Sequence, residues 1–240
     1  QGPSLKLLGI GGAKAIVRLF NPVTKNEQWK VELPTGSLVA ALNDDELLAV
    51  PLDGKAERIE IATGRRSPLE SLPSNAMQGR RGETFAMVDD ERIYLLVNTL
   101  DNSGVHHYGE SLLSVRAHGT IYAWNRADGK LAWKQDVKHQ NLVVDRFRSL
   151  PVMLFVSRSW KQRGNMSYGT LSIQAIHKHS GKVLHDSTTP SMYSGFHSIQ
   201  VNASEPSIEF KSYNLRMRLV PVAGPVAGVT TTPMPIENKN

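Results

Sequence analysis

Histidine is the side chain to consider first for a transition-metal site, because the chain has no cysteine. His177 and His179 lie two residues apart beside a turn, a spacing that places both side chains on one face of a strand. A zinc site needs a third or fourth ligand, for which His185 or Asp186 is the nearest candidate. His106 and His107 are adjacent, so in an extended strand their side chains would point to opposite faces. We interpret all of these as surface and turn histidines, so the sequence predicts no metal site.

Paired carboxylates occur at Asp44-Asp45 and at Asp89-Asp90, each pair between two short apolar runs. Glycoside hydrolysis uses two carboxyl groups that face each other across a substrate. Aspartates in hairpin turns have a simpler role, because their side chains accept hydrogen bonds from nearby backbone N–H groups. The sequence contains no Gly-x-Ser-x-Gly elbow, and its glycine run at residues 9–12 is followed by Ala13-Lys14 rather than by a phosphate-binding Gly-Lys-Ser/Thr. No catalytic or cofactor-binding residue is therefore predicted.

One local cluster of basic side chains stands out in residues 146–163. The members are Arg146, Arg148, Arg158, Lys161 and Arg163, with Trp160 and Tyr168 nearby. Cations interleaved with aromatic rings suit an anionic ligand such as a nucleic acid, an anionic glycan or a lipid head group. A solvated loop between two strands has the same composition, and the net charge of +6 is spread among acidic residues. Both readings of the basic loop 146–163 stay open.

Short apolar runs separated by turn residues predict strands along most of the chain. Hairpins are expected at residues 38–50, 56–69, 85–97 and 196–213. Two insertions, residues 98–111 and 157–168, are expected to be surface loops. From residue 221 the composition shifts to Pro, Gly, Val, Ala and Thr, so we expect a domain over residues 1–220 and a flexible tail over 221–240.

One motif recurs: a strand, a tight turn, and a second strand that ends in tryptophan. It is clearest at residues 119–133, with Asp128-Gly129 at the turn, and weaker copies lie at residues 17–29, 59–65 and 173–183. The turn positions Thr24, Thr63, Asp128 and Ser180 are spaced so that about four strands fit in each interval, as in a propeller blade of ~40–50 residues. An immunoglobulin-like sandwich has many short strands too, but does not require the same motif several times. The sequence predicts an all-β propeller with about five four-stranded, blade-like units, in a ring that need not be complete.

The motif resembles the repeat of PQQ-like (quinoprotein-type) β-propellers: apolar strand, Ala-x-Asn/Asp, Thr/Asp-Gly-Lys, then Trp. The match is good at residues 123–133, fair at 19–29 and 175–184, and poor at 59–65. The resemblance implies WD40-like four-stranded blades, with Trp29 and Trp133 packed between neighbouring blades. The chain departs from the pattern where Leu69 or a neighbour, and His185, stand in place of tryptophan.

The resemblance also carries expectations about function. Quinoprotein dehydrogenases of this fold bind PQQ and calcium at the propeller centre, and many place a vicinal cysteine pair against the cofactor, whereas this chain has no cysteine. We therefore expect a non-enzymatic member without a cofactor: a binding or scaffold module of a bacterial envelope or secreted protein, located in the periplasm or outside the cell. It would recognise a protein partner, or other domains of the same precursor, through the insertions at residues 98–111 and 157–168. The alternative is a degenerate quinoprotein-type oxidoreductase or a hydrolase that uses the central pocket.

Length and composition agree with a folded domain, since the chain has 240 residues, 40% hydrophobic and 21% charged. No apolar run approaches the ~20 residues of a membrane-spanning helix. The first residues, Gln1-Gly-Pro-Ser, lack both an initiator Met and the pattern of a signal peptide. The sequence is thus expected to be a C-terminal part of a longer protein.

Overall fold

The computed structural model consists of strands, turns and one short 3-10 helix, η1 (Phe147–Ser149), within the residues that it describes. These are residues 4–8, 14–78, 83–100, 107–108, 113–144, 147–163, 166–190, 198–202, 207–211, 216–222 and 228–234. The chain divides into two compact units. Unit 1 comprises residues 1–100 and 119–136, and unit 2 comprises residues 101–118 and 137–240. Two long strands, β11 (Ser114–Asn125) and β12 (Leu131–Val143), contribute residues to both units.

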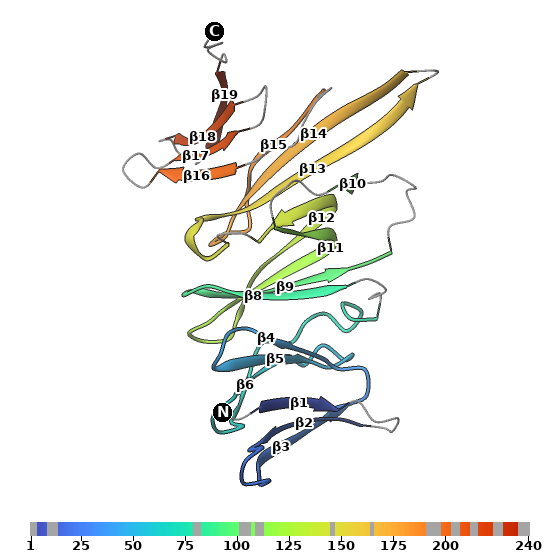
Figure 1. Cartoon of the computed structure of the whole chain (residues 1–240), viewed down its shortest axis with the longest axis vertical. Coiled ribbons are helices and arrows are strands. Elements are labelled where there is room, and N and C mark those ends of the chain that lie inside the picture. The colour runs from blue at the N-terminus through green and yellow to red at the C-terminus, as the bar shows by residue number, and fades with distance from the viewer. Residues whose placement is uncertain are drawn as a thin grey trace. The chain divides into compact units, whose positions relative to one another are not determined.

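Unit 1 is built from antiparallel sheets that follow one another along the chain (Figure 1). The first sheet contains β1 (Ser4–Leu8), β2 (Lys14–Phe20) and β3 (Glu27–Pro34), and the second contains β4 (Leu38–Ala41), β5 (Glu46–Val50), β6 (Glu57–Glu60) and β7 (Arg66–Pro68). The third contains β8 (Thr84–Val88), β9 (Arg92–Asn98), and the parts of β11 and β12 that belong to unit 1. The hairpins predicted at residues 38–50, 56–69 and 85–97 are therefore confirmed.

Unit 2 contains a second set of antiparallel strands. The end of β12 pairs with β13 (Val152–Arg163) through Leu142 and Phe155, and β13 continues to β14 (Met166–His177) and β15 (Val183–Pro190). The short strand β10 (His107–Tyr108) pairs with β13 as well. A last sheet contains β16 (Ser198–Asn202), β17 (Ser207–Lys211), β18 (Arg216–Val222) and β19 (Gly228–Met234).

The repeated turn has one backbone hydrogen bond in common in all four copies. In each copy one residue donates its N–H to the carbonyl of the fifth residue onward: Asn21 to Asn26 (3.0 Å), Glu60 to Arg65 (2.9 Å), Asn125 to Lys130 (2.8 Å) and His177 to Lys182 (2.8 Å). The residue before that acceptor always has a positive φ: Lys25 57°, Gly64 72°, Gly129 71° and Gly181 69°. Together with the sheet β16–β19, these turns mark about five blade-like units in the described part of the chain. The predicted fold class, an all-β propeller of PQQ-like blades, is confirmed.

The turns between β4 and β5 and between β8 and β9 are also equivalent. Asn43 Oδ1 accepts the N–H groups of Asp45 and Glu46, both at 2.8 Å, and Asp89 Oδ1 accepts those of Glu91 (3.1 Å) and Arg92 (2.8 Å). The expected capping role is thus correct for Asp89. In the earlier hairpin it is wrong for Asp44-Asp45, because the amide oxygen of Asn43 already takes both N–H groups.

Tryptophans connect successive sheets of unit 1. Trp29 Nε1 donates to the carbonyl of Ile61 in the second sheet (2.8 Å), and its ring lies so close to Gly64 that a Cβ there would be 2.7 Å away. This packing confirms the inter-blade role expected for Trp29. Trp133 lies 6.0 Å, between ring centroids, from Tyr94 of its own sheet, so its inter-blade role stays a prediction. Trp124, which the repeat did not single out, is fully buried and donates Nε1 to the carbonyl of Glu70 (2.8 Å).

Two expected irregular segments differ from the structure. The insertion at 157–168 is not a loop, since β13 and β14 pair from Ser157 with Ser172 to Arg163 with Met166. The segment 221–240 contains a strand, β19, that pairs with β18. Both segments are rich in polar or turn-forming residues, but main-chain hydrogen bonds to a neighbouring strand hold residues 157–163, 166–168 and 228–234 extended, and such bonds leave little trace in composition.

Candidate functional site

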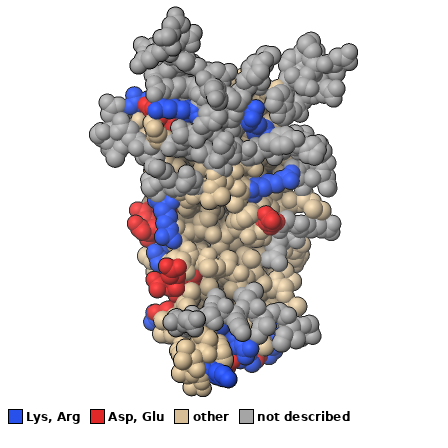
Figure 2. Space-filling view, viewed as in Figure 1, with Lys and Arg blue, Asp and Glu red and all other residues tan. Residues whose placement is uncertain are grey.

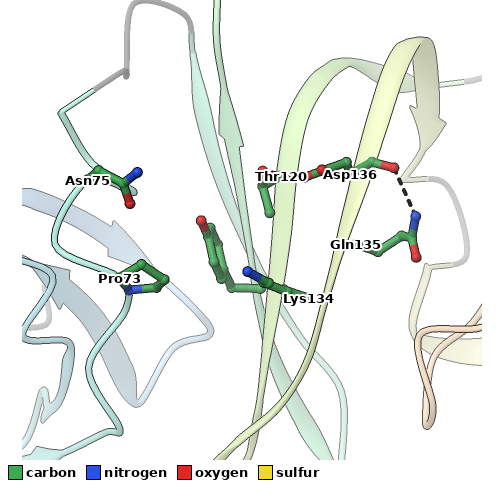
Figure 3. Close-up of a pocket in the computed structure, with 7 residues that line it drawn as sticks. Pro73, Asn75, Thr120, Lys134, Gln135 and Asp136 are labelled. Carbon is green, nitrogen blue, oxygen red and sulfur yellow. Dashed lines mark hydrogen bonds between the residues drawn. The ribbon is translucent and has the colours of Figure 1, made fainter.

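A polar pocket of about 390 Å³ lies in unit 1, between β11 and β12 and the segment that joins the second sheet to the third. Its lining residues are Pro73, Asn75, Thr120, Tyr122, Lys134, Gln135 and Asp136. Figure 3 shows Pro73 and Asn75 on the connecting segment, across the pocket from Thr120, Lys134 and Asp136 on the strands. The pocket therefore combines side chains from segments far apart in the sequence.

The strand side of the pocket follows from the alternation of β12. Lys134 and Asp136 lie two residues apart and share one face, and Thr120 of β11 donates its hydroxyl to Asp136 Oδ1 at 2.6 Å. Gln135 has the opposite orientation, and its Nε2 donates to the backbone carbonyl of Asp136 at 3.1 Å (Figure 3). Burial raises the pKa of the Tyr122 phenol, and a hydrogen bond with Thr120 partly opposes this shift. The phenol is thus neutral at physiological pH and is available as a hydrogen-bonding group.

The opposite side of the pocket is a tight turn held by buried residues at both ends. Leu72 and Met77 flank it within the apolar core, and the N–H of Ala76 donates to the carbonyl of Pro73 at 2.8 Å. The N–H of Leu72 donates to the carbonyl of Gly54 at 2.9 Å. Gly54 has a φ of 83°, and a Cβ there would lie 2.7 Å from the carbonyl oxygen of Leu72, so only glycine allows this close approach.

Glu70 joins the two sides of the pocket. Its N–H donates to the carbonyl of Gly129 (2.8 Å), its carbonyl accepts Trp124 Nε1 (2.8 Å), and its Oε2 accepts the N–H of Leu131 (2.9 Å). The connecting segment is therefore fixed to the β11–β12 hairpin before any ligand arrives. Such preorganisation reduces the entropy that binding would cost.

The pocket presents groups that bind polar ligands. Within the described residues, the Lys134 ammonium and the Asn75 side-chain amide form no hydrogen bond or ion pair, and both border the pocket. Opposite charges balance there, with one ammonium and one carboxylate among the lining residues. The sequence analysis missed this site, although the polar alternation of Lys134 and Asp136 beside the strongest repeat was a readable signal.

The histidines considered for metal binding have ordinary partners. The His177 and His179 ring centroids are 6.3 Å apart, and His177 Nδ1 lies 2.8 Å from Ser180 Oγ. Burial lowers the pKa of His177, and the nearby charges of His179 and Lys182 act in the same direction. His185 Nε2 lies 2.7 Å from Ser187 Oγ. In the part of the chain that the structure describes, no three His, Asp or Glu residues are arranged to hold a metal ion, and His106 lies outside that part.

The basic residues at 146–163 are arranged differently from the expected loop. Arg148 belongs to η1 and is exposed, Arg158 is a half-buried residue of β13, and Lys161 and Arg163 continue that strand. Arg146 lies outside the described residues. Elsewhere, cationic and anionic side chains lie next to one another along one edge of the view in Figure 2. An anionic ligand at 146–163 stays a prediction, and the loop itself is corrected to a helix and a strand.

Residues 13–193 match the family described as outer membrane protein assembly factor BamB. The chain belongs to the BamB family. The match covers the four copies of the repeated turn, so the PQQ-like repeat inferred from the sequence is confirmed in this BamB-family chain. No curated protein matches the chain. Within the described residues, no helix is long and apolar enough to cross a membrane.

Solved structures show distant likenesses to this BamB-family chain. The Dos1 propeller is 10% identical, with a TM-score of 0.41 over 92% of this chain and 67% of the other. The computationally designed Ika8 protein is 11% identical, with a TM-score of 0.36 over 91% and 71%. Dihydro-heme d1 dehydrogenase NirN in complex with DHE is 12% identical, with a TM-score of 0.32 over 92% and 45%. Likenesses at this level carry no conclusion about function.

Proposed function

We propose that this BamB-family chain is a non-catalytic binding module of the bacterial envelope, which recognises a protein partner during the assembly of outer-membrane proteins. The observation that carries the proposal is the family match over residues 13–193. We also propose a periplasmic location, which the same family description supports because the assembly of outer-membrane proteins takes place at the envelope.

The insertion at residues 98–111 is the first candidate for the partner-binding surface. Leu100, within the insertion, is 49% exposed, and Leu113, two residues after it, is 71% exposed. Residues 101–106 and 109–112 lie outside the described part of the chain. Exposed apolar side chains beside a recognition segment add contact area that loses water on binding. The end of the β13–β14 hairpin is the second candidate.

Site-specific photo-crosslinking in cells tests this proposal. A photoreactive amino acid at position 100 or 113 of the full-length protein should crosslink to proteins of outer-membrane assembly, identified by mass spectrometry. Val23 is the matched control, because it is also an exposed apolar residue (70%) but belongs to the turn between β2 and β3. Equal crosslinking from positions 23, 100 and 113, or none from positions 100 and 113, would contradict the assigned surface.

The quinoprotein-type alternative predicts a different result. PQQ with calcium would raise the melting temperature if the protein bound this cofactor in its folded state, by an amount that grows with ligand concentration. The binding-module proposal predicts an unchanged melting temperature. A concentration-dependent increase would overturn the non-catalytic assignment and favour the oxidoreductase.

A further inference from the structure

We propose that the pocket between β11, β12 and residues 73–75 is a binding site for a neutral saccharide. This site is independent of the partner surface proposed above, because it consists of a preformed cavity rather than of the insertion. Its volume of about 390 Å³ is at the lower end of the ~300–1,000 Å³ that is typical of small-molecule sites. That volume suits one or two sugar rings better than a large cofactor.

The charge of the lining selects against simple ions. Lys134 and Asp136 lie on the same face of β12, so an anion attracted by the ammonium is repelled by the carboxylate. A cation attracted by the carboxylate is likewise repelled by the ammonium. Both side chains are exposed, so neither charge requires an ionic partner to offset a loss of water. A neutral ligand with many hydrogen-bonding groups can form hydrogen bonds with both side chains without this repulsion.

The hydrogen-bonding groups of the lining match hydroxyl chemistry. A hydroxyl group donates one hydrogen bond and accepts two, whereas a carboxylate only accepts and an ammonium only donates. Lys134 and Asn75 offer donors that have no partner in the described residues, and Asp136 retains acceptor capacity beyond its bond to Thr120. Adjacent hydroxyl groups of a sugar can donate to Asp136 and accept from Lys134 at the same time.

The hydrogen bond from Thr120 to Asp136 orients the hydrogen-bonding groups of the site. Because Thr120 directs its hydroxyl hydrogen to Asp136, its oxygen accepts from the neighbouring Tyr122 phenol, and one acceptor position of the Thr120 oxygen remains for a ligand. Gln135 fixes the backbone of Asp136 from the other face of the strand. The hydroxyl-binding groups are therefore oriented without a ligand, as Glu70 also orients the two sides of the pocket.

Nuclear magnetic resonance titration of the full chain tests the proposal. The probes are D-glucose, D-galactose, N-acetyl-D-glucosamine and maltose, with sodium acetate, methylammonium chloride and N-acetyl-glutamine-methylamide as competing chemistries. We expect at least one sugar to shift the amide signals of residues 75, 120, 122 and 134–136, with a dissociation constant on the order of 1 mM. Shifts by acetate, methylammonium or the blocked peptide alone would overturn the saccharide assignment, as would no shift by any sugar.

Three variants connect the binding to the named side chains. Lys134→Met and Asp136→Ala remove the exposed charged groups, and Thr120→Val removes the hydroxyl at nearly constant shape, so each should weaken sugar binding about tenfold through the loss of one or two hydrogen bonds. Lys130→Met and Asp90→Ala are matched controls, because both residues are exposed and neither lines the pocket. Unchanged affinity in Lys134→Met, the variant least expected to disturb folding, would overturn the site. Equal losses in the controls would do so too.

Discussion

Lys25 adopts a left-handed backbone conformation that its side chain disfavours. It occupies the place of Gly64, Gly129 and Gly181 in the repeated turn, with a φ of 57°. A residue other than glycine loses about 1–2 kcal/mol in this conformation. The hydrogen bond of the turn, from Asn21 to Asn26, persists nonetheless, so the surrounding strands impose the geometry.

Placing glycine at position 25 and alanine at position 129 should therefore change the stability of the fold in opposite directions. We expect Lys25→Gly to raise the free energy of unfolding by up to about 1 kcal/mol, after the greater freedom of glycine in the unfolded chain is subtracted. Gly129→Ala should lower it by about 1–2 kcal/mol, because a Cβ there also lies 3.1 Å from the carbonyl oxygen of Pro68. Urea unfolding of the two variants measures both changes in the free energy of unfolding. Destabilisation by Lys25→Gly would contradict the equivalence of the turns.

Glu32 is the residue with a distinct expected pH dependence. Hydrogen bonds and charges from Lys14 (2.7 Å) and Lys30 (2.9 Å) lower the pKa of its carboxyl group from 4.5 to about 2. A carboxyl pKa that is lower in the folded state stabilises the fold above the unfolded value. This contribution is present above about pH 4.5 and is lost as the pH falls toward 2. In carboxyl-detected NMR titrations, Lys14→Met should move the pKa of Glu32 upward, while Lys55→Met, in the second sheet, should leave it unchanged.

Trp124 and Trp29 make the same kind of bond in different surroundings. Both donate Nε1 to a main-chain carbonyl at 2.8 Å, but Trp124 is fully buried and Trp29 is only partly so. Trp124→Phe removes this bond and also shortens a fully buried side chain of the apolar core, at a cost of about 1–3 kcal/mol. Trp29→Phe should cost less, since the Trp29 side chain is only half-buried and the smaller ring leaves less of a cavity. Chemical denaturation compares the two, and a larger loss for Trp29→Phe would contradict this ranking.

At the scale of elements, main-chain hydrogen bonds join the turns within a sheet of unit 1, and a side chain joins one sheet to the next. Within the second sheet the N–H of Ile61 donates to the carbonyl of Asp45 (2.7 Å), and within the third the N–H of Arg126 donates to that of Glu91 (2.9 Å). The Arg126 side chain crosses from the third sheet to the second, where it contacts Glu46 Oε2 at 2.7 Å. The repeat thus specifies how a sheet contacts its neighbour as well as how a turn is formed.

The Arg126–Glu46 ion pair should contribute measurably to this junction. We expect Arg126→Met to lower the free energy of unfolding by about 0.5–1 kcal/mol, the upper part of the range for partly exposed pairs, and the difference should decrease at high salt. Arg66→Met is the control, because Arg66 pairs with Glu57 within one sheet and its side chain is 51% exposed. Equal losses of stability in the two variants would show that the ion pair between sheets contributes no more than an ion pair within one sheet.

The repeated turn and most hairpins could be predicted because their causes are local. A glycine with positive φ, a side-chain cap such as Asp89, and alternating apolar residues all lie within a few positions of the feature they produce. The strand at 157–163 was missed because its polar residues are ordered by main-chain bonds to β14. The pocket was missed for a related reason: Lys134 and Asp136 look like an ordinary solvent-facing pattern until Pro73 and Asn75 are brought opposite them.

At the scale of the whole molecule, the two compact units share strands rather than a linker. Unit 2 includes β11 up to His118 and β12 from Val137, while unit 1 includes the stretch between them, residues 119–136. A disturbance of either strand is therefore expected to reach both units through the continuous backbone. Sharing of this kind favours one cooperative unfolding transition.

Gly119 lies where β11 passes from one unit to the other, and it provides the test. A Cβ at this position would clash with the carbonyl oxygen of Val97, so Gly119→Ala must displace the pairing of β11 with β9. We expect a loss of about 1–3 kcal/mol, with faster hydrogen exchange in β8 and β9 of unit 1 and also in β13 and β14 of unit 2. Gly36→Ala is the control, because its new Cβ meets only the flexible side chain of Leu52, which should confine the effect to the turn between β3 and β4. Faster exchange in unit 1 alone would mean that the shared strands do not couple the two units.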